Sequence, residues 1–93
     1  EVVLIEYPRN GMWAIAFITA ETSGEVKQKL KRKSVNVFLP TTPNPTSGFL
    51  LFVPTKDIIR LSMNIEEGMK LVISGGIITP KYLKSKRNTS RLK

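Results

Sequence analysis

The stretch VVLIEYPRNGMWAIAFIT, residues 2–19, decides the fold class. Two apolar segments, 2–7 and 12–19, flank the turn-forming residues 8–11 (PRNG), and this order predicts a β-hairpin. In the second segment both alternating sets of positions are apolar, so both faces should be buried and the strand should be central in its sheet. The small side chains of Ala14 and Ala16 would let a helix pack closely on one of these faces.

The chain after the hairpin carries further strand patterns. Residues 34–39 alternate in polarity and stop at Pro40, while residues 49–53 (FLLFV) are wholly apolar and predict a fourth, fully buried strand. Residues 61–63 are a candidate fifth strand, and residues 77–79 a candidate edge strand. The polar residues 20–33 between the second and third strands predict a long basic connection.

Two helical segments are expected. Thr55 is a candidate cap for a short helical turn over residues 55–60. The main helix is predicted over residues 64–75, because Asn64 is a good N-cap, Glu67 completes a capping box, and two glycines follow the helix. One stripe of this helix is expected to pack over the alanine face of the second strand, and its members are Ile65, Met69, Val72 and Ile73.

These elements together predict one α+β domain over residues 1–80. Its sheet is expected to be small and mostly antiparallel, open or barrel-like, with four to six strands, one packed α-helix (64–75) and one short helical turn (55–60). Residues 81–93 form a basic segment that is predicted to be a disordered tail.

The amino-acid composition excludes most common catalytic mechanisms. The 93 residues contain no histidine and no cysteine, so the usual general base, a disulfide framework and a thiolate zinc site are all absent. We therefore expect no enzyme, no metal site and no cofactor. The sequence contains no run of 18 apolar residues, the length that a membrane-spanning helix needs. Because the chain begins with Glu1, we expect a fragment of a longer protein whose preceding part holds a membrane anchor.

The positive charge is concentrated in two places. The net charge is +8, yet residues 1–80 hold nine Lys or Arg residues against seven Asp or Glu residues. The remaining six cations lie in residues 81–93. The second concentration, here called the basic cluster, consists of Lys27, Lys29, Lys31, Arg32 and Lys33. Such runs attract phosphate on nucleic acid or on anionic lipid, and the alternative is a solvated loop and a frayed tail.

The most unusual segment is PTTPNPTSG, residues 40–48, with three prolines in nine residues. Its structural interpretation is a rigid loop between two strands, in which X-Pro bonds are able to adopt the cis form and Gly48 permits a positive φ. Its functional interpretation is a preorganised surface for a partner or an anion, with candidate residues Thr41, Thr42, Asn44, Thr46, Ser47 and Gly48. A nucleophilic Ser47 would need a base, and only a lysine is available.

Residues 37–48 (VFLPTTPNPTSG) resemble the signature of the family called domain of unknown function 502, which includes plant continuous-vascular-ring-like membrane proteins. The likeness extends over residues 6–13, 17–19, 49–54 and 65–76. The chain departs from the pattern at Ser62, where an acidic residue is expected, and at Gly68, where a helix former such as alanine is usual. Glycine there should cost the helix about 1 kcal/mol.

The resemblance implies a particular placement and no activity. Two transmembrane helices would precede this domain, which would lie on the cytoplasmic side of a bacterial inner membrane. The first functional hypothesis is therefore a non-enzymatic, membrane-tethered interaction or assembly module. Its partners would be a second copy or a membrane protein, with the basic cluster facing anionic lipid headgroups.

Two other functions compete with this hypothesis. A nucleic-acid-binding β module would use the positive charge and stack bases on Tyr7, Trp13 or Phe38, but these aromatics lie in apolar strands and are expected to be core. A hydrolase using Ser47 or a neighbouring threonine ranks last, because no base is evident.

Overall fold

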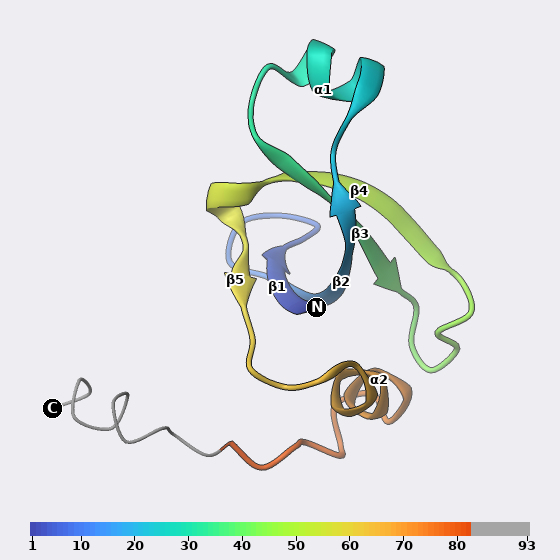
Figure 1. Ribbon diagram of the computed structural model, residues 1–93. Coiled ribbons are helices and arrows are strands. Elements are labelled where there is room, and N and C mark those ends of the chain that lie inside the picture. The colour runs from blue at the N-terminus through green and yellow to red at the C-terminus, as the bar shows by residue number, and fades with distance from the viewer. Residues whose placement is uncertain (83–93) are drawn as a thin grey trace, which may run out of the picture.

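The computed structural model describes residues 1–82 (Figure 1). Its elements, in chain order, are β1 (Val2–Glu6), β2 (Trp13–Glu21), α1 (Gly24–Leu30), β3 (Ser34–Pro40), β4 (Gly48–Pro54), the 3-10 turn η1 (Thr55–Asp57), β5 (Ile59–Arg60) and α2 (Ile65–Ile73). Most of the predicted tail, residues 83–93, lies outside the described residues. No helix among residues 1–82 has the length and apolar character needed to cross a membrane.

The five strands form one antiparallel sheet in the order β4-β3-β2-β1-β5. This confirms the α+β class and the central position of β2. The barrel-like alternative is wrong, because the two edge strands β4 and β5 are joined through η1 and do not pair with each other. Closing a barrel needs continuous pairing around the sheet, and β5 offers only two residues, paired with Val3 and Leu4.

The predicted hairpin is present. β1 pairs with β2 from Val2 opposite Phe17 to Glu6 opposite Trp13. At the turn, the Gly11 N–H donates to a Glu6 carboxylate oxygen at 3.0 Å, and Gly11 has a φ of 89°, which glycine adopts without strain. The peptide bond between Tyr7 and Pro8 is cis.

The concave face of the sheet holds the main core. Its buried members are Val3, Ile5, Ala16, Val35, Val37 and Leu39. The sheet is curled enough that the ring of Tyr7, just after β1, lies 6.3 Å from the ring of Phe49 at the start of β4. Ala16 is fully buried opposite Val3, so its small side chain fits the inside of the curled sheet.

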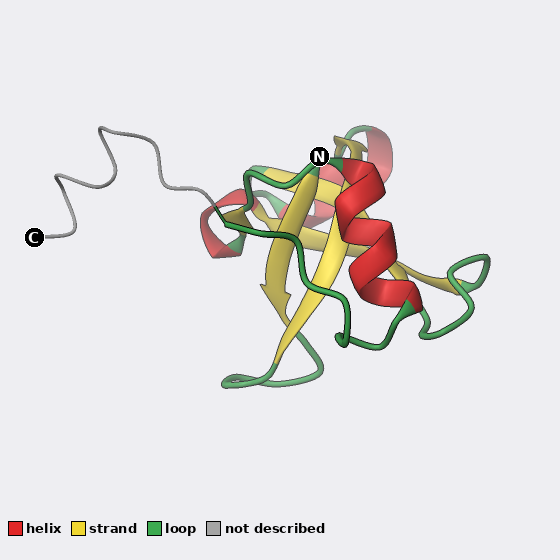
Figure 2. Cartoon of the chain, turned by 90° about the horizontal axis from the view of Figure 1, so that it is seen from below, coloured by secondary structure: helices red, strands yellow, loops and turns green. Residues whose placement is uncertain are grey.

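Helix α2 packs on the opposite face of the sheet (Figure 2). Adjacent strand residues point to opposite faces, and the paired Val2 and Phe17 are therefore turned away from Val3 and Ala16. A Cβ on Gly68 would lie 3.2 Å from side-chain atoms of both Val2 and Phe17. The prediction that the helix covers Ala14 and Ala16 is therefore wrong.

The start of α2 is as predicted, and its buried stripe is as predicted in part, since Val72 is buried and Met69 is half-buried. The Asn64 side chain accepts from the Glu67 N–H at 2.8 Å, and a Glu67 carboxylate oxygen accepts from the Asn64 N–H at 2.9 Å, which completes the capping box. The buried positions are Gly68 and Val72, whereas Ile65 and Ile73 are 56% and 49% exposed. Gly68 brings the helix backbone close to the sheet, so even a methyl group there would make a tight contact with the side chains of Val2 and Phe17.

Four further expectations need correction. Residues 24–30 form the helix α1, not part of a loop, and Ser23 occupies its N-cap position. Glu25 in the first turn and the lysines in the last turn have the charges that the helix dipole favours at those ends. The fifth strand is 59–60 instead of 61–63, and residues 77–79 form no strand. The helical turn expected over residues 55–60 is the shorter η1, whose N-cap is Pro54 and not Thr55.

Candidate functional site

Strand β4 presents an uncovered apolar edge. It pairs with β3 on one side, and no described strand flanks its other side. Phe49, Leu50 and Phe52 are 53%, 62% and 38% exposed, and the strand (GFLLFVP) contains no charged residue. The prediction of a fully buried strand is wrong. Leu51 and Val53 pack against the core, whereas Leu50 and Phe52 point to the other face of the sheet, where they stay exposed.

The 41–47 loop leads directly into β4 and is held by its own hydrogen bonds. The Thr41 hydroxyl donates to the carbonyl oxygens of Asn44 and Ser47, and the Thr41 N–H donates to the Ser47 carbonyl at 2.9 Å. The Asn44 side-chain oxygen accepts from the N–H and hydroxyl of Thr46 at 3.1 and 2.6 Å. The loop is therefore preorganised, and the side chains of Thr41, Asn44 and Thr46 serve its own structure.

Thr42 and Ser47 remain the candidates for an external contact in this loop, and the Thr42 methyl group lies close to Gly75 after α2. Both are exposed, and neither side chain hydrogen-bonds to another residue in the range 1–82. The Thr42–Pro43 bond is cis. Gly48 does not have the positive φ that we expected. A Cβ there would instead collide with the Leu39 carbonyl oxygen and lie 2.7 Å from the Phe38 ring, so Gly48 allows β3 and β4 to approach.

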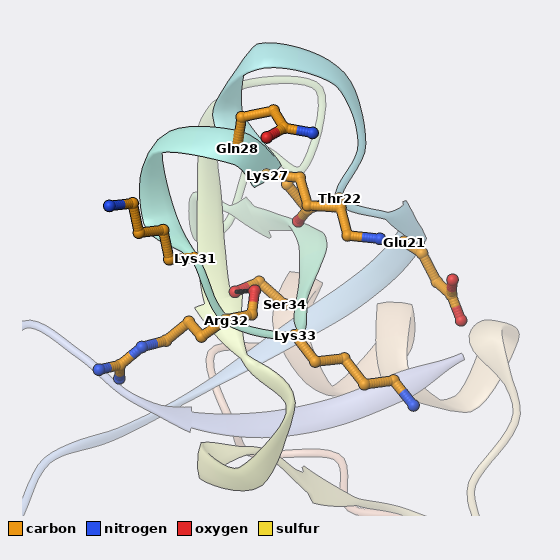
Figure 3. A pocket seen from close by; sticks show the side chains of 8 residues that line it. All are labelled: Glu21, Thr22, Lys27, Gln28, Lys31, Arg32, Lys33 and Ser34. Carbon is orange, nitrogen blue, oxygen red and sulfur yellow. Dashed lines mark hydrogen bonds between the residues drawn. The ribbon is translucent and has the colours of Figure 1, made fainter.

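The basic cluster surrounds α1 and the connection to β3. Its five side chains are exposed, and Lys31 ends the helix in the left-handed conformation with its N–H donating to the Lys27 carbonyl at 3.0 Å. A shallow hollow here is lined by four of the cations together with Glu21, Thr22, Gln28 and Ser34. Figure 3 shows that Lys31 and Arg32 point to one side of this connection and Lys33 to the other, so the charges splay outward and do not converge on one point.

The tertiary structure adds three residues to this surface. Lys56, from η1, lines a second hollow together with Lys31, Arg32 and Lys33, and the Thr55 N–H fixes η1 by donating to the Lys33 carbonyl at 3.0 Å. Val26 and Leu30 are exposed on α1 itself. Residues 20–33 were expected to form a loop, in which the four-residue spacing of Val26 and Leu30 has no meaning. In the helix α1 the same spacing places the two side chains on one face.

The aromatic residues proposed for base stacking do not lie near the cations. Trp13 is 46% exposed, contrary to the expectation of a core residue, while Tyr7 and Phe38 are half-buried. Trp13 begins β2, whereas the basic cluster follows the other end of that strand. Eight residue steps of extended chain separate these ends by roughly 25 Å. A stacking platform within a basic groove is therefore not assembled at this strand.

The polar groups of residues 1–82 form no recognisable catalytic centre. They include no cluster of three or more Asp or Glu residues placed to hold a metal ion. The clearest titration effect is at Glu1, where a hydrogen bond from Arg60 lowers the pKa of the carboxyl group. This exposed pair joins β5 to the start of β1 and is a surface contact of small energetic weight.

Comparison with known proteins places the chain in a family. The family model described as "Protein of unknown function (DUF502)" matches residues 1–47, half of the chain. Protein LIKE COV 1 and Protein CONTINUOUS VASCULAR RING 1 of Arabidopsis thaliana are each 32% identical to it over 83 residues, which cover 89% of the chain. Protein LIKE COV 3 of the same plant is 33% identical over 89 residues.

The chain spans about a third of the length of these curated relatives, 32% of the first and 30% of the second. No solved structure matches it. The resemblance inferred from residues 37–48 is confirmed for the family, and the family's own description assigns no activity. The chain belongs to the DUF502 family of proteins of unknown function.

Proposed function

We propose that this chain is a non-enzymatic assembly domain of a membrane-anchored protein, and that it joins a second copy of itself through the free edge of β4. The observation that carries the proposal is the uncharged, exposed apolar edge formed by Phe49, Leu50 and Phe52. Soluble proteins usually protect such edges with charges, bulges or a covering element, because an open edge adds strands from other chains.

The edge of β4 favours a second copy as its occupant. An antiparallel pair of identical strands is self-complementary about a twofold axis, so main-chain hydrogen bonds and the apolar side chains would match in both directions. The chain has a net charge of +8, yet β4 has no charged residue. Two copies that repel elsewhere can therefore approach most closely at this edge.

The same arrangement gives the 41–47 loop a role. In an antiparallel β4 pair, the Gly48 end of one copy lies beside the Pro54 end of the other. The uncharged loop ahead of Gly48 would then face η1 and Lys56 of the second copy, so no cations oppose each other there. Thr42 and Ser47, which do not stabilise their own loop, are the residues we expect to contact η1 of the second copy.

Membrane anchoring is part of the proposal and is supported by the family resemblance. We place the domain at the cytoplasmic face of a bacterial inner membrane, where a tether would raise the local concentration of the copies. A membrane-protein partner is the alternative occupant of β4. The nucleic-acid alternative is weaker, because the exposed Trp13 and the basic cluster lie at opposite ends of β2.

Sedimentation velocity over a range of protein concentrations tests self-assembly. We expect a reversible dimer whose dissociation constant rises at least about tenfold in Leu50→Lys and in Phe52→Lys, because a lysine on an edge strand opposes pairing. Added salt should strengthen the wild-type dimer by screening the repulsion between basic copies. Hydrogen exchange of residues 49–53 should slow as the dimer forms.

Ile59→Lys provides the matched control, because Ile59 is 47% exposed on the opposite edge strand β5. This variant should dimerise like wild type. A chain that stays monomeric at every concentration, or a dimer lost equally in Ile59→Lys, would contradict assembly through β4. Binding of β4 only to a membrane-protein partner would replace the second copy as its occupant.

A further inference from the structure

We propose that α1 is a membrane-surface contact, which inserts Val26 and Leu30 into the interface of an anionic bilayer while the basic cluster binds the lipid phosphates. α1 stands apart from the sheet, at the end of the molecule opposite α2 (Figure 1). None of its seven residues is buried. The proposal uses no residue of the β4 edge, so it stands or falls independently of the proposed assembly.

The apolar component comes from one face of α1. Val26 and Leu30 are 36% and 43% exposed, and residues four positions apart lie on the same side of a helix. Helical spacing of 3.6 residues per turn places Lys27 and Lys29 on either side of this apolar pair. Lysines in such positions can extend toward the headgroups while the aliphatic residues enter the apolar layer.

The charge component matches an anionic surface. Residues 21–33 contain five cations and two acids, and Lys56 adds a further cation beside Lys31, Arg32 and Lys33. Each cation close to an anionic bilayer strengthens binding by about fivefold at moderate salt. The outward splay of Lys31, Arg32 and Lys33 suits many phosphates spread over a surface better than one phosphate in a pocket (Figure 3).

A single fluorescent label on the 93-residue chain tests this orientation. The chain has no cysteine, so Leu30→Cys and Ile73→Cys each provide one attachment point for a polarity-sensitive dye. Ile73, on α2, is a matched control because it is 49% exposed on the opposite side of the molecule. Vesicles of phosphatidylcholine with about one third phosphatidylserine should shift the emission at position 30 to the blue and leave position 73 unchanged.

Vesicle sedimentation measures the two components separately. The double variant Val26→Ser and Leu30→Ser keeps every charge and should bind anionic vesicles about tenfold more weakly. The matched double variant Ile65→Ser and Ile73→Ser should bind like wild type. Raising the salt to about 0.5 M should release the wild-type chain, since screening removes most of the attraction between the cations and the surface.

Four results would overturn the proposal. The first is a blue shift at position 73 with none at position 30, and the second is equal binding to pure phosphatidylcholine vesicles. The third is a blue shift at position 30 with a single-stranded oligonucleotide but not with anionic vesicles, which would identify nucleic acid as the ligand of this surface. The fourth is unchanged vesicle binding by the Val26 and Leu30 double variant, which would contradict insertion.

Discussion

Strands β3 and β4 meet at Gly48, where the strand pair leaves no space for a side chain. A Cβ at this position would collide with the Leu39 carbonyl oxygen and with the Phe38 ring. Backbone atoms cannot move aside as a flexible side chain can, so even a methyl group would push the strands apart. A glycine is therefore required here for close approach, although its φ is not in the left-handed region.

Gly48→Ala should lower the free energy of unfolding by about 1–3 kcal/mol, the usual cost of overpacking a close contact. Urea denaturation followed by circular dichroism measures this loss. The neighbouring Ser47→Ala should stay within about 0.5 kcal/mol of wild type, because Ser47 is exposed. Equal stability of Gly48→Ala and wild type would show that the strands can separate at this point without cost.

Gly68 has a comparable role inside a helix. Glycine weakens a helix by about 1 kcal/mol relative to alanine, yet here the helix backbone lies directly over Val2 and Phe17. An added Cβ would be 3.2 Å from three side-chain atoms, a tight contact that small side-chain shifts can relieve. The lower helix propensity is therefore offset by closer packing of α2 on the sheet.

At the scale of elements, α2 is attached to the sheet less firmly than the strands are attached to one another. Its buried residues are Gly68 and Val72, whereas β2 is hydrogen-bonded on both sides, to β1 and β3. Elements with few buried contacts open locally at a lower free energy than the whole domain. We therefore expect α2 to open without unfolding of the sheet.

Native-state hydrogen exchange with Asn64→Ala tests this expectation. Loss of the N-cap should lower the protection of the α2 amides by about 1 kcal/mol and leave the most protected β2 and β3 amides unchanged. Glu67→Gln is the control, because glutamine can keep the capping box. Equal losses of protection in α2 and in the sheet would mean that the helix opens only by global unfolding.

Over the whole molecule, the two proposed contacts lie on different elements and respond differently to salt. The β4 edge is uncharged and should pair more strongly as salt screens repulsion between copies, whereas the α1 surface should lose its lipid as salt screens attraction. A single salt titration that follows both the oligomeric state and vesicle binding therefore separates the two interactions.

The anchored arrangement makes a prediction about the coding sequence ahead of Glu1. It should encode two apolar segments of about 20 residues each, the length needed to cross a bilayer as a helix. Sequencing the gene upstream and fractionating cells that express the whole protein would check this. A whole protein that stays in the supernatant after membranes are sedimented would contradict the tether. The proposed pairing through β4 would not be affected by that result, because sedimentation velocity tests it separately.

Local chemistry in the sequence was sufficient to predict several elements of this protein. The β1–β2 hairpin follows from its turn residues, and the start of α2 follows from Asn64 and Glu67, because such signals act within a few residues of the chain. The rigidity of the 41–47 loop also has a local origin in its prolines, threonines and Asn44. The motif at residues 37–48 was likewise sufficient to recognise the family.

Only the tertiary structure decided which faces are covered. The apolar run in β4 is equally compatible with a buried strand and with an exposed edge, since the place of a strand in the sheet order depends on pairing between distant segments. The curl of the sheet turns Ala16 inward and leaves Val2 and Phe17 for α2. For the same reason Lys56 comes to lie beside the basic cluster only after the chain has folded, because a long-range contact places η1 next to Lys33. Val26 and Leu30 share one side for a local reason, the helical turn of α1.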